Sequence, residues 1–216
     1  MKPMYWVLGG LGIAGLLSLL PKGSGIAPAA SEYVPIGTPP AATGSQSKNV
    51  LRWVPLVRGA QAFTQSEVPM ARILSTIHHE SGGNPKAMSY YRHGPSGDPR
   101  MPKSIEKADK DTRLQWMRDN WHGHAYGLGQ LIPETGKQYA GIQGAGYALY
   151  PGQPGQSYDP ALNILGTVRF LNHLWKVEGG DLDKIASAYY AGEAGGKHLD
   201  YEQNARKEDA VYAGVS

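Results

Sequence analysis

Apolar residues recur with helical spacing along much of the chain. One stripe follows the i, i+3, i+4, i+7 pattern of a buried helix face and consists of Met70, Ile73, Leu74 and Ile77. Glu80 comes three residues after Ile77 and belongs to the same face. Residues 81–85 then contain two glycines and a proline, which end a helix. The pattern therefore predicts a helix with a carboxyl group at the end of its apolar face.

Similar patterns predict further helices. Ser66 is expected to cap the Glu80 helix, with Pro69 in its first turn. No strictly alternating pattern extends beyond a few residues, so the fold is predicted to be mostly α. The other predicted helices cover residues 50–63, a long segment that starts at Asp159-Pro160 and ends at Gly179-Gly180, a segment capped by Asp181, and residues 199–211.

The N-terminal segment, residues 1–21, is predicted to be a hydrophobic helix. Residues 4–20 are uncharged, and their length is at the lower limit for crossing a bilayer. Several glycines in this run permit close helix packing in a membrane. The alternative is a signal peptide cleaved near Ala29, where small residues offer a cleavage site. We favour a retained anchor, and both interpretations place the rest of the chain outside the cytoplasm.

The remaining chain divides into a linker and one domain. Residues 22–48 are rich in Pro, Gly, Ala, Ser and Thr, which is typical of a flexible linker. Residues 49–216 are enough for one domain with its own hydrophobic core. Residues 90–124 interrupt this domain with a proline-rich stretch and a charged amphipathic segment. We expect them to form a loop-and-helix insertion at the surface.

Composition limits the possible chemistry. The chain has no cysteine, and therefore neither a thiol nucleophile nor a cysteine-ligated zinc site. The formal net charge is +3, but three lysines and one glutamate lie in the first 48 residues, so the rest carries about +1. This charge is too small to predict a nucleic-acid partner bound through a basic face.

Glu80 is the principal candidate for catalysis. Burial on an apolar face disfavours the ionised carboxylate, and the helix C-terminus adds partial negative charge, so both effects raise the pKa of Glu80. A carboxylic acid that stays protonated near neutral pH can donate a proton to a glycosidic oxygen. The alternative is a structural glutamate held by a buried partner.

Three blocks in fixed order carry a family resemblance. They are Glu-Ser-Gly-Gly-Asn-Pro-Lys-Ala-Met-Ser at residues 80–89, Ala-Tyr-Gly-Leu-Gly-Gln-Leu-Ile-Pro-Glu-Thr at 125–135, and Ala-Tyr-Tyr-Ala-Gly at 188–192, with Asp159-Pro160 and Asn163-Ile164 before the third. The ordered set, over roughly residues 66–195, resembles the soluble lytic transglycosylase domain of glycoside hydrolase family 23. The resemblance implies a lysozyme-like helical fold, shared with goose-type lysozyme.

The resemblance also implies roles for single residues. Glu80 aligns with the single catalytic acid and base of the family, and Ser81 with the residue that helps to fix the following turn. Gln130 aligns with a glutamine that lines the sugar groove, and Tyr189 with a tyrosine whose hydroxyl lies near the catalytic carboxyl. The substrate-binding residues are therefore predicted to be Ser81, Ser89, Tyr126, Gln130, Tyr189, Tyr190 and Glu193.

This sequence departs from the family pattern at several positions. Gly129 stands where the second block usually has methionine. Tyr190 replaces an asparagine that would contact substrate, and Glu193 stands where the family often has proline. The insertion at 90–124 replaces a short connection, and we expect it to form a lid or a wall of the sugar-binding cleft.

The implied activity is cleavage of peptidoglycan between N-acetylmuramic acid and N-acetylglucosamine, with formation of a 1,6-anhydro ring and no cofactor. One alternative is a muramidase, which needs a second carboxylate to activate water; Glu193 and Asp98 are the candidates. Another alternative is a non-catalytic component of an envelope-penetrating machine, although a degenerate family member would be expected to have lost Glu80.

Several histidines and aromatic residues lie near the blocks. His78, His79, His122 and His124 flank two of the blocks, but the helical His-Glu-x-x-His spacing of a zinc protease is missing, so no metal site is predicted. Trp116 and Trp121 lie in the insertion, and we expect Trp116 to be packed. Tyr126, beside the second block, is the better candidate for sugar contact.

The expected partners are peptidoglycan strands and a membrane contacted through residues 4–20. A tethered enzyme of this kind suits a virion, a secretion or conjugation complex, or cell-wall remodelling. The protein is accordingly expected to be membrane-anchored and to face the periplasm or cell wall, or to be carried by a virion.

Overall fold

The computed structural model describes residues 46–89, 102–119, 124–142, 156–191 and 198–215. The predicted N-terminal anchor and nearly all of the predicted linker lie outside these ranges. The described residues are mostly helical, as predicted, and include one pair of two-residue strands. Across them no helix is both long enough and apolar enough to span a membrane.

Two of the predicted helices form the centre of the fold. Helix α3 (Met70–Ser81) carries the apolar stripe and Glu80. Helix α7 (Pro160–Val177) begins where predicted, because the side chain of Asp159 accepts hydrogen bonds from the backbone N–H groups of Ala161 and Leu162. The prediction for Ser66 is wrong: Pro69 is the N-cap of α3, and the Ser66 hydroxyl accepts from the Val68 N–H within the preceding loop.

The first predicted helix is two helices, α1 (Gln46–Leu51) and α2 (Val54–Thr64). Pro55 lies in the first turn of α2. A proline in the middle of one continuous helix would lack an N–H and collide with the carbonyl four residues earlier, so the chain breaks before it. Helix α1 also starts three residues inside the range predicted as linker.

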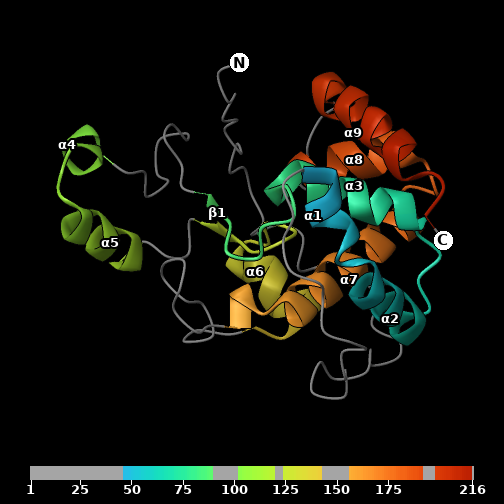
Figure 1. The fold of residues 1–216 in the computed structure, drawn as a ribbon, viewed down its shortest axis with the longest axis horizontal. Coiled ribbons are helices and arrows are strands. Elements are labelled where there is room, and N and C mark those ends of the chain that lie inside the picture. Colours follow the sequence, from blue (N-terminus) through green and yellow to red (C-terminus); the bar gives the residue numbers. More distant parts are fainter. Residues whose placement is uncertain (1–45, 90–101, 120–123, 143–155, 192–197, 216) are drawn as a thin grey trace.

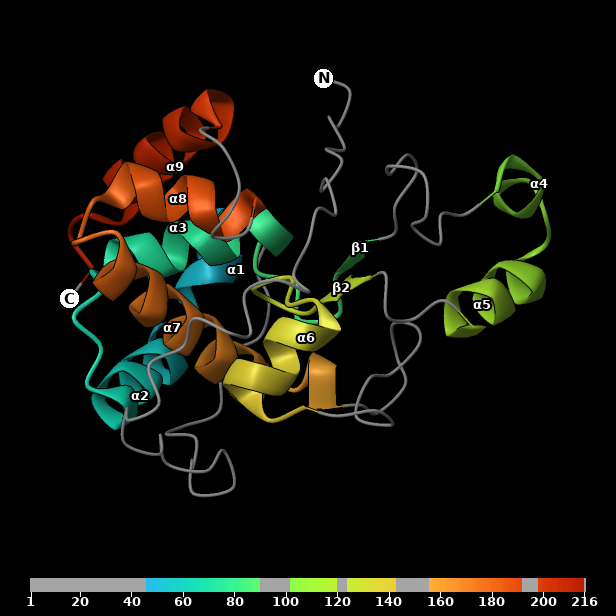
Figure 2. The ribbon, with the colours of Figure 1, turned by 180° about the vertical axis from the view of Figure 1, so that it is seen from behind.

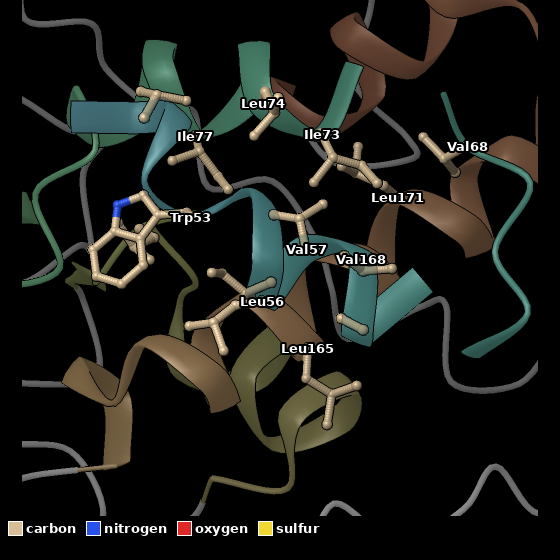
Figure 3. Close-up of a cluster of buried hydrophobic side chains, with 14 of the residues drawn as sticks. Trp53, Leu56, Val57, Val68, Ile73, Leu74, Ile77, Leu165, Val168 and Leu171 are labelled. Atoms are coloured by element: carbon tan, nitrogen blue, oxygen red, sulfur yellow. The ribbon is translucent and has the colours of Figure 1, made fainter. Parts of the chain in front are cut away.

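The main hydrophobic core lies between α2, α3 and α7. Figure 3 shows the side chains of the α3 stripe pointing toward Leu56 and Val57 of α2, with Val168 and Leu171 of α7 beside them. Full burial of a side chain of this size contributes about 1.5–3 kcal/mol. The fully buried residues of the stripe, each with 0% exposure, are Ile73, Leu74 and Ile77.

Helices α8 (Leu182–Ala191) and α9 (Leu199–Tyr212) complete this body, with α9 lying over α3 and α8 (Figures 1 and 2). An ion pair joins α3 to α9, since the buried Arg72, 1% exposed, lies 2.5 Å from a carboxylate oxygen of Asp209, which is 18% exposed. The Ser75 hydroxyl donates to the other oxygen of Asp209 at 2.6 Å. These polar contacts define where α9 docks on α3.

A second, smaller cluster lies on the other side of α7. Strands β1 (Met88–Ser89) and β2 (Ala125–Tyr126) are antiparallel, with Met88 opposite Tyr126. The insertion therefore leaves and re-enters the domain at paired residues. Around this cluster the chain forms α6 (Pro133–Thr135), the π-helical turn η4 (Gly136–Ala140) and the 3-10 turn η6 (Gln156–Tyr158), and its buried side chains are Tyr126, Leu131, Ala140, Ile142 and Tyr158.

The described part of the insertion forms α4 (Lys103–Glu106) and α5 (Lys110–Asp119). Both helices stand apart from the other helices in the two opposite views (Figures 1 and 2). Trp116 is half-buried and lies edge-on to His124, with ring centroids 6.0 Å apart, so it is packed as expected. The expectation that the insertion forms a lid or cleft wall stays a prediction.

Replacing Gly83 by alanine should destabilise the fold more than the same change at Gly179. Both glycines have positive φ angles, +80° and +62°, which cost a non-glycine residue about 1 kcal/mol. At Gly83 an added Cβ would also lie 2.7–2.9 Å from backbone atoms of Asn49 and Val50, whereas nothing lies within 4 Å at Gly179. Urea unfolding of Gly83→Ala should show an additional loss of about 1–3 kcal/mol over Gly179→Ala, and equal losses would contradict the packing of α1 against this turn.

Candidate active site

Glu80 lies in the last turn of α3, where the helix ends as predicted. Gly82 has the left-handed conformation, φ 59°, and its N–H donates to the His78 carbonyl at 2.8 Å. The Ser81 hydroxyl donates to the Ile77 carbonyl at 3.0 Å and accepts from the Gly83 N–H at 3.2 Å. Ser81 thus holds the turn that follows Glu80. Its predicted contact with substrate stays a prediction.

Tyr201 holds the Glu80 carboxyl group. Its hydroxyl donates to Oε1 of Glu80 at 2.6 Å, and the tyrosine itself is buried on α9. Burial raises the pKa of Glu80, while the Tyr201 hydrogen bond and the charge of His79 lower it, and the charge of Glu208 raises it further. Burial prevails, and the net pKa is raised. The carboxyl group is therefore both oriented and kept protonated to a higher pH than an exposed glutamate.

Sequence reasoning missed Tyr201. A signal was present, because Tyr201, Ala205 and Tyr212 are spaced for one face of the predicted last helix, and Glu208 and Asp209 lie on or next to that face. Acidic residues beside an aromatic stripe indicate a helix face that meets polar groups of a neighbour. Which neighbour it meets depends on how α9 docks.

Tyr189 lies near Glu80, but its hydroxyl has another partner. It donates to the Gly129 carbonyl at 2.6 Å. The pKa of Tyr189 is raised well above its ordinary value, first by burial and then by the charge of Glu80, and a hydrogen bond with Thr167 opposes this. Tyr189 thereby ties the third block to the second block, and the tyrosine that donates to the Glu80 carboxyl group is Tyr201 of α9.

The second block forms a tight turn closed by Tyr126 and Leu131, whose backbone N–H and C=O groups exchange hydrogen bonds of 3.1 and 3.0 Å. Within it Gln130 has a φ of 49°, a left-handed conformation that is uncommon for a side chain other than glycine. The Gln130 amide donates to the Gly127 carbonyl at 2.9 Å. Gln130 is therefore held within its own turn while remaining partly exposed.

The side chain of Asn163 on α7 holds this turn by hydrogen bonds. Its side-chain amide nitrogen donates to the carbonyls of Tyr126 and Ser157, at 2.9 and 3.1 Å, and its oxygen accepts from the Gly129 N–H at 2.8 Å. One buried amide thus satisfies three backbone groups. A Cβ on Gly127 would lie 2.3 Å from the Asn163 amide, which accounts for the glycine at that position.

Gly129 is required for a similar steric reason. A Cβ at this position would lie 2.0 Å from the Thr167 hydroxyl and 2.9 Å from the Tyr189 hydroxyl. These two hydroxyl groups occupy the space that a larger residue would need. The position of the Thr167 side chain therefore accounts for glycine at position 129, where the family usually has methionine.

The other predicted binding residues lie in different surroundings. Tyr190 is half-buried and its ring lies 4.9 Å from that of Tyr201. Tyr126 is fully buried, with 0% exposure, and its ring packs edge-on against Tyr158, so as placed it offers a sugar no surface. Ser89 is in β1, paired with Ala125. Glu193 lies outside the described residues, as do Asp98, Trp121 and His122.

Those histidines near the blocks that the structure describes, His78, His79 and His124, contact other side chains. The Tyr212 hydroxyl is 2.8 Å from Nδ1 of His78, and Glu208 is 3.5 Å from Nδ1 of His79. His124 is fully buried and lies edge-on to the rings of Trp116 and Tyr126. Within the described ranges no three side chains of His, Asp or Glu converge as metal ligands would.

The chain matches a protein-family model over most of its length. The model of the transglycosylase SLT domain matches residues 60–211. This range covers more than half of the chain and contains the three blocks and nearly all of α9, including Tyr201. A search of curated proteins finds no significant match, and a search of solved structures finds none.

Glu80→Gln should make the fold more stable than the parent as the pH rises. The folded-state pKa of Glu80 is raised, so the favourable protonated form is present at acid pH and is lost as the pH rises through that pKa. Glutamine has no charge to bury and avoids this loss. Thermal unfolding at acid, neutral and mildly alkaline pH should show the difference in Tm growing with pH.

The exposed Glu67→Gln controls for the loss of a carboxylate. A Glu80→Gln protein whose Tm follows the parent at every pH would contradict a destabilising ionisation at this site.

Proposed function

Since the chain belongs to the transglycosylase SLT domain family, we propose that it is a lytic transglycosylase that cleaves peptidoglycan between N-acetylmuramic acid and N-acetylglucosamine. The family acts on peptidoglycan by cleaving glycosidic bonds. The observation that carries the finer proposal for this chain is the Glu80 carboxyl group, whose pKa is raised by burial and whose orientation is set by Tyr201. An acid for glycoside cleavage needs both properties.

In the proposed reaction Glu80 first acts as the acid. It donates its proton to the bridging oxygen, and the bond between this oxygen and the anomeric carbon of the muramic acid breaks. The neighbouring N-acetyl group stabilises the positive charge that develops at this carbon, so a second protein carboxylate is not needed. Tyr201 keeps one carboxyl oxygen hydrogen-bonded, which leaves the other free to face the substrate.

Glu80 then acts as the base. Now ionised, it takes the proton from the 6-hydroxyl of the same muramic acid, and the 6-oxygen bonds to the anomeric carbon. The attacking oxygen belongs to the substrate and is already in position, which favours ring closure over attack by water. The products are a 1,6-anhydro muramic end and a free hydroxyl on the released sugar. The protonated Glu80 is regenerated.

We propose that the second block and Tyr189 line the substrate site. Gln130 supports this assignment, because it is partly exposed and held in a left-handed conformation by its own turn, and such backbone strain clusters at functional sites. Ser81, Ser89, Tyr190 and Glu193 remain proposed contacts on the family resemblance. In this proposal Tyr126 does not contact the substrate; it closes the turn that carries Gln130.

Glu80→Gln should reduce the release of muropeptides from purified peptidoglycan by about 10²-fold or more, because it removes the general acid and base. Mass spectrometry of the parent's products should show 1,6-anhydro muramic ends. Glu67→Gln, on the exposed surface, should retain activity.

Two outcomes would change the proposal. Reducing muramic ends would indicate a muramidase. Absence of release by the parent protein would indicate a non-catalytic component of an envelope machine.

We further propose that residues 4–20 tether the enzyme to a membrane, facing the periplasm or cell wall, in a virion, a secretion or conjugation complex, or a cell that remodels its wall. The support is the uncharged hydrophobic run in the sequence. N-terminal sequencing of the protein recovered from membranes should give the uncleaved chain. A mature N-terminus near Ala29 would indicate a secreted enzyme instead.

A further inference from the structure

Three consecutive residues at the end of α3 are each held by a different residue of α9. Tyr212 contacts His78 at 2.8 Å, Glu208 contacts His79 at 3.5 Å, and Tyr201 donates to Glu80 at 2.6 Å. Residues 201, 208 and 212 share one face of α9. Glu80 is therefore the last of three consecutive residues in a row of polar contacts between α3 and α9, which pack against each other.

His79 connects two members of this row. Its ring lies edge-on against the ring of Tyr201, with centroids 4.3 Å apart. Its Nδ1 faces Glu208, and the two side chains are 27% and 20% exposed. A residue paired with Glu208 on one side and packed on Tyr201 on the other restricts the position of the tyrosine ring whose hydroxyl holds Glu80.

The titratable and charged groups around Glu80 and His79 come from three helices. On α9 they are Tyr201, Glu208 and the nearby Asp209 and Tyr212, with Asp209 paired to Arg72 of α3. On α8 they are Tyr189 and Tyr190. On α3 itself, His78 directly precedes His79. The face of α3 toward α2 and α7 presents the apolar, fully buried side chains of Ile73, Leu74 and Ile77.

Within this set, His79 and Glu208 have opposite effects on the acid. The His79 cation lowers the pKa of Glu80, and the Glu208 charge raises it. Burial lowers the pKa of His79, but the hydrogen bond to Glu208 and the charges of Glu80 and Glu208 outweigh it, so the net pKa of His79 is raised. The pKa values of His79 and Glu80 are thus both raised, and the charge of each group affects the pKa of the other.

We propose that His79, paired with Glu208, is a positioning residue that holds Tyr201 against Glu80 and whose charge sets the upper pH limit of the reaction. This inference rests on the proposed function, because it concerns the proton that Glu80 donates. A cationic His79 favours the ionised form of Glu80, so the acid loses its proton at a lower pH than it would alone. When His79 loses its charge, Glu80 retains its proton to higher pH.

The test compares His79→Gln with His78→Gln in the full chain in detergent micelles. The rate of release of 1,6-anhydro muropeptides is measured across the pH range in which Glu80 and His79 titrate. His79→Gln should move the alkaline limb of the profile upward by roughly half a unit to one unit. His78→Gln, one residue earlier and held by Tyr212, should leave the limb in place.

A limb that does not move in His79→Gln, or that moves equally in His78→Gln, would overturn the proposal, even if the maximal rate falls, because a merely structural role changes the rate without moving the limb. An inactive parent protein would refute the proposed function, and with it any role of His79 in the reaction.

A second measurement is independent of activity and of whether His79→Gln folds. NMR titration of the imidazole signals, assigned with the two histidine variants or by backbone correlation, should place the pKa of His79 above its ordinary value in the parent. Glu208→Gln keeps both rings and should lower that pKa. An unchanged His79 titration in Glu208→Gln would refute the pairing on which the inference stands.

Discussion

The hydrogen bond between Tyr201 and Glu80 joins the helix that builds the core to the last helix of the chain. A general acid must be oriented and must also keep its proton. A donated hydrogen bond orients the carboxyl group but favours its ionised form, so it works against the second requirement. Burial works in the other direction and prevails at Glu80. The site therefore depends on the docking of α9, which supplies the Tyr201 hydroxyl that donates to Glu80 and packs against the helix that carries Glu80.

The docking of α9 is itself a polar arrangement. Arg72 and Asp209 form a partly buried ion pair between α3 and α9, and Ser75 satisfies the second carboxylate oxygen. Pairs of this kind add little stability compared with apolar residues, but removing Asp209 would leave the buried charge of Arg72 uncompensated. A shifted register between the two helices would break this pair and the Tyr201 contact together.

The second block is held by α7 and is joined directly to the third block on α8. Asn163 holds three backbone groups around the second block, and Tyr189 donates to the Gly129 carbonyl. The departures from the family pattern are compatible with this arrangement. The Thr167 hydroxyl stands where a side chain on Gly129 would begin, and the Tyr190 ring packs beside Tyr201, where the family has a smaller amide.

Local sequence determined the helices, because helical periodicity and capping depend on residues a few positions apart. The stripe that ends at Glu80 and the Asp159 cap of α7 are of this kind. The break between α1 and α2 before Pro55 is also a local feature. The prediction of one helix over residues 50–63 followed the apolar spacing and did not take the proline into account. The order of three short blocks was enough to indicate the family, which the family comparison confirmed.

The partners within the site were decided by the tertiary structure alone. Tyr201 is separated from Glu80 by 121 residues, and no spacing rule connects them. Tyr126 shows the reverse case: its place beside the second block suggested sugar contact, but strand pairing turned its ring into a buried cluster. Periodicity states which face of a helix is buried, whereas the neighbour that covers this face follows from the packing of the whole chain.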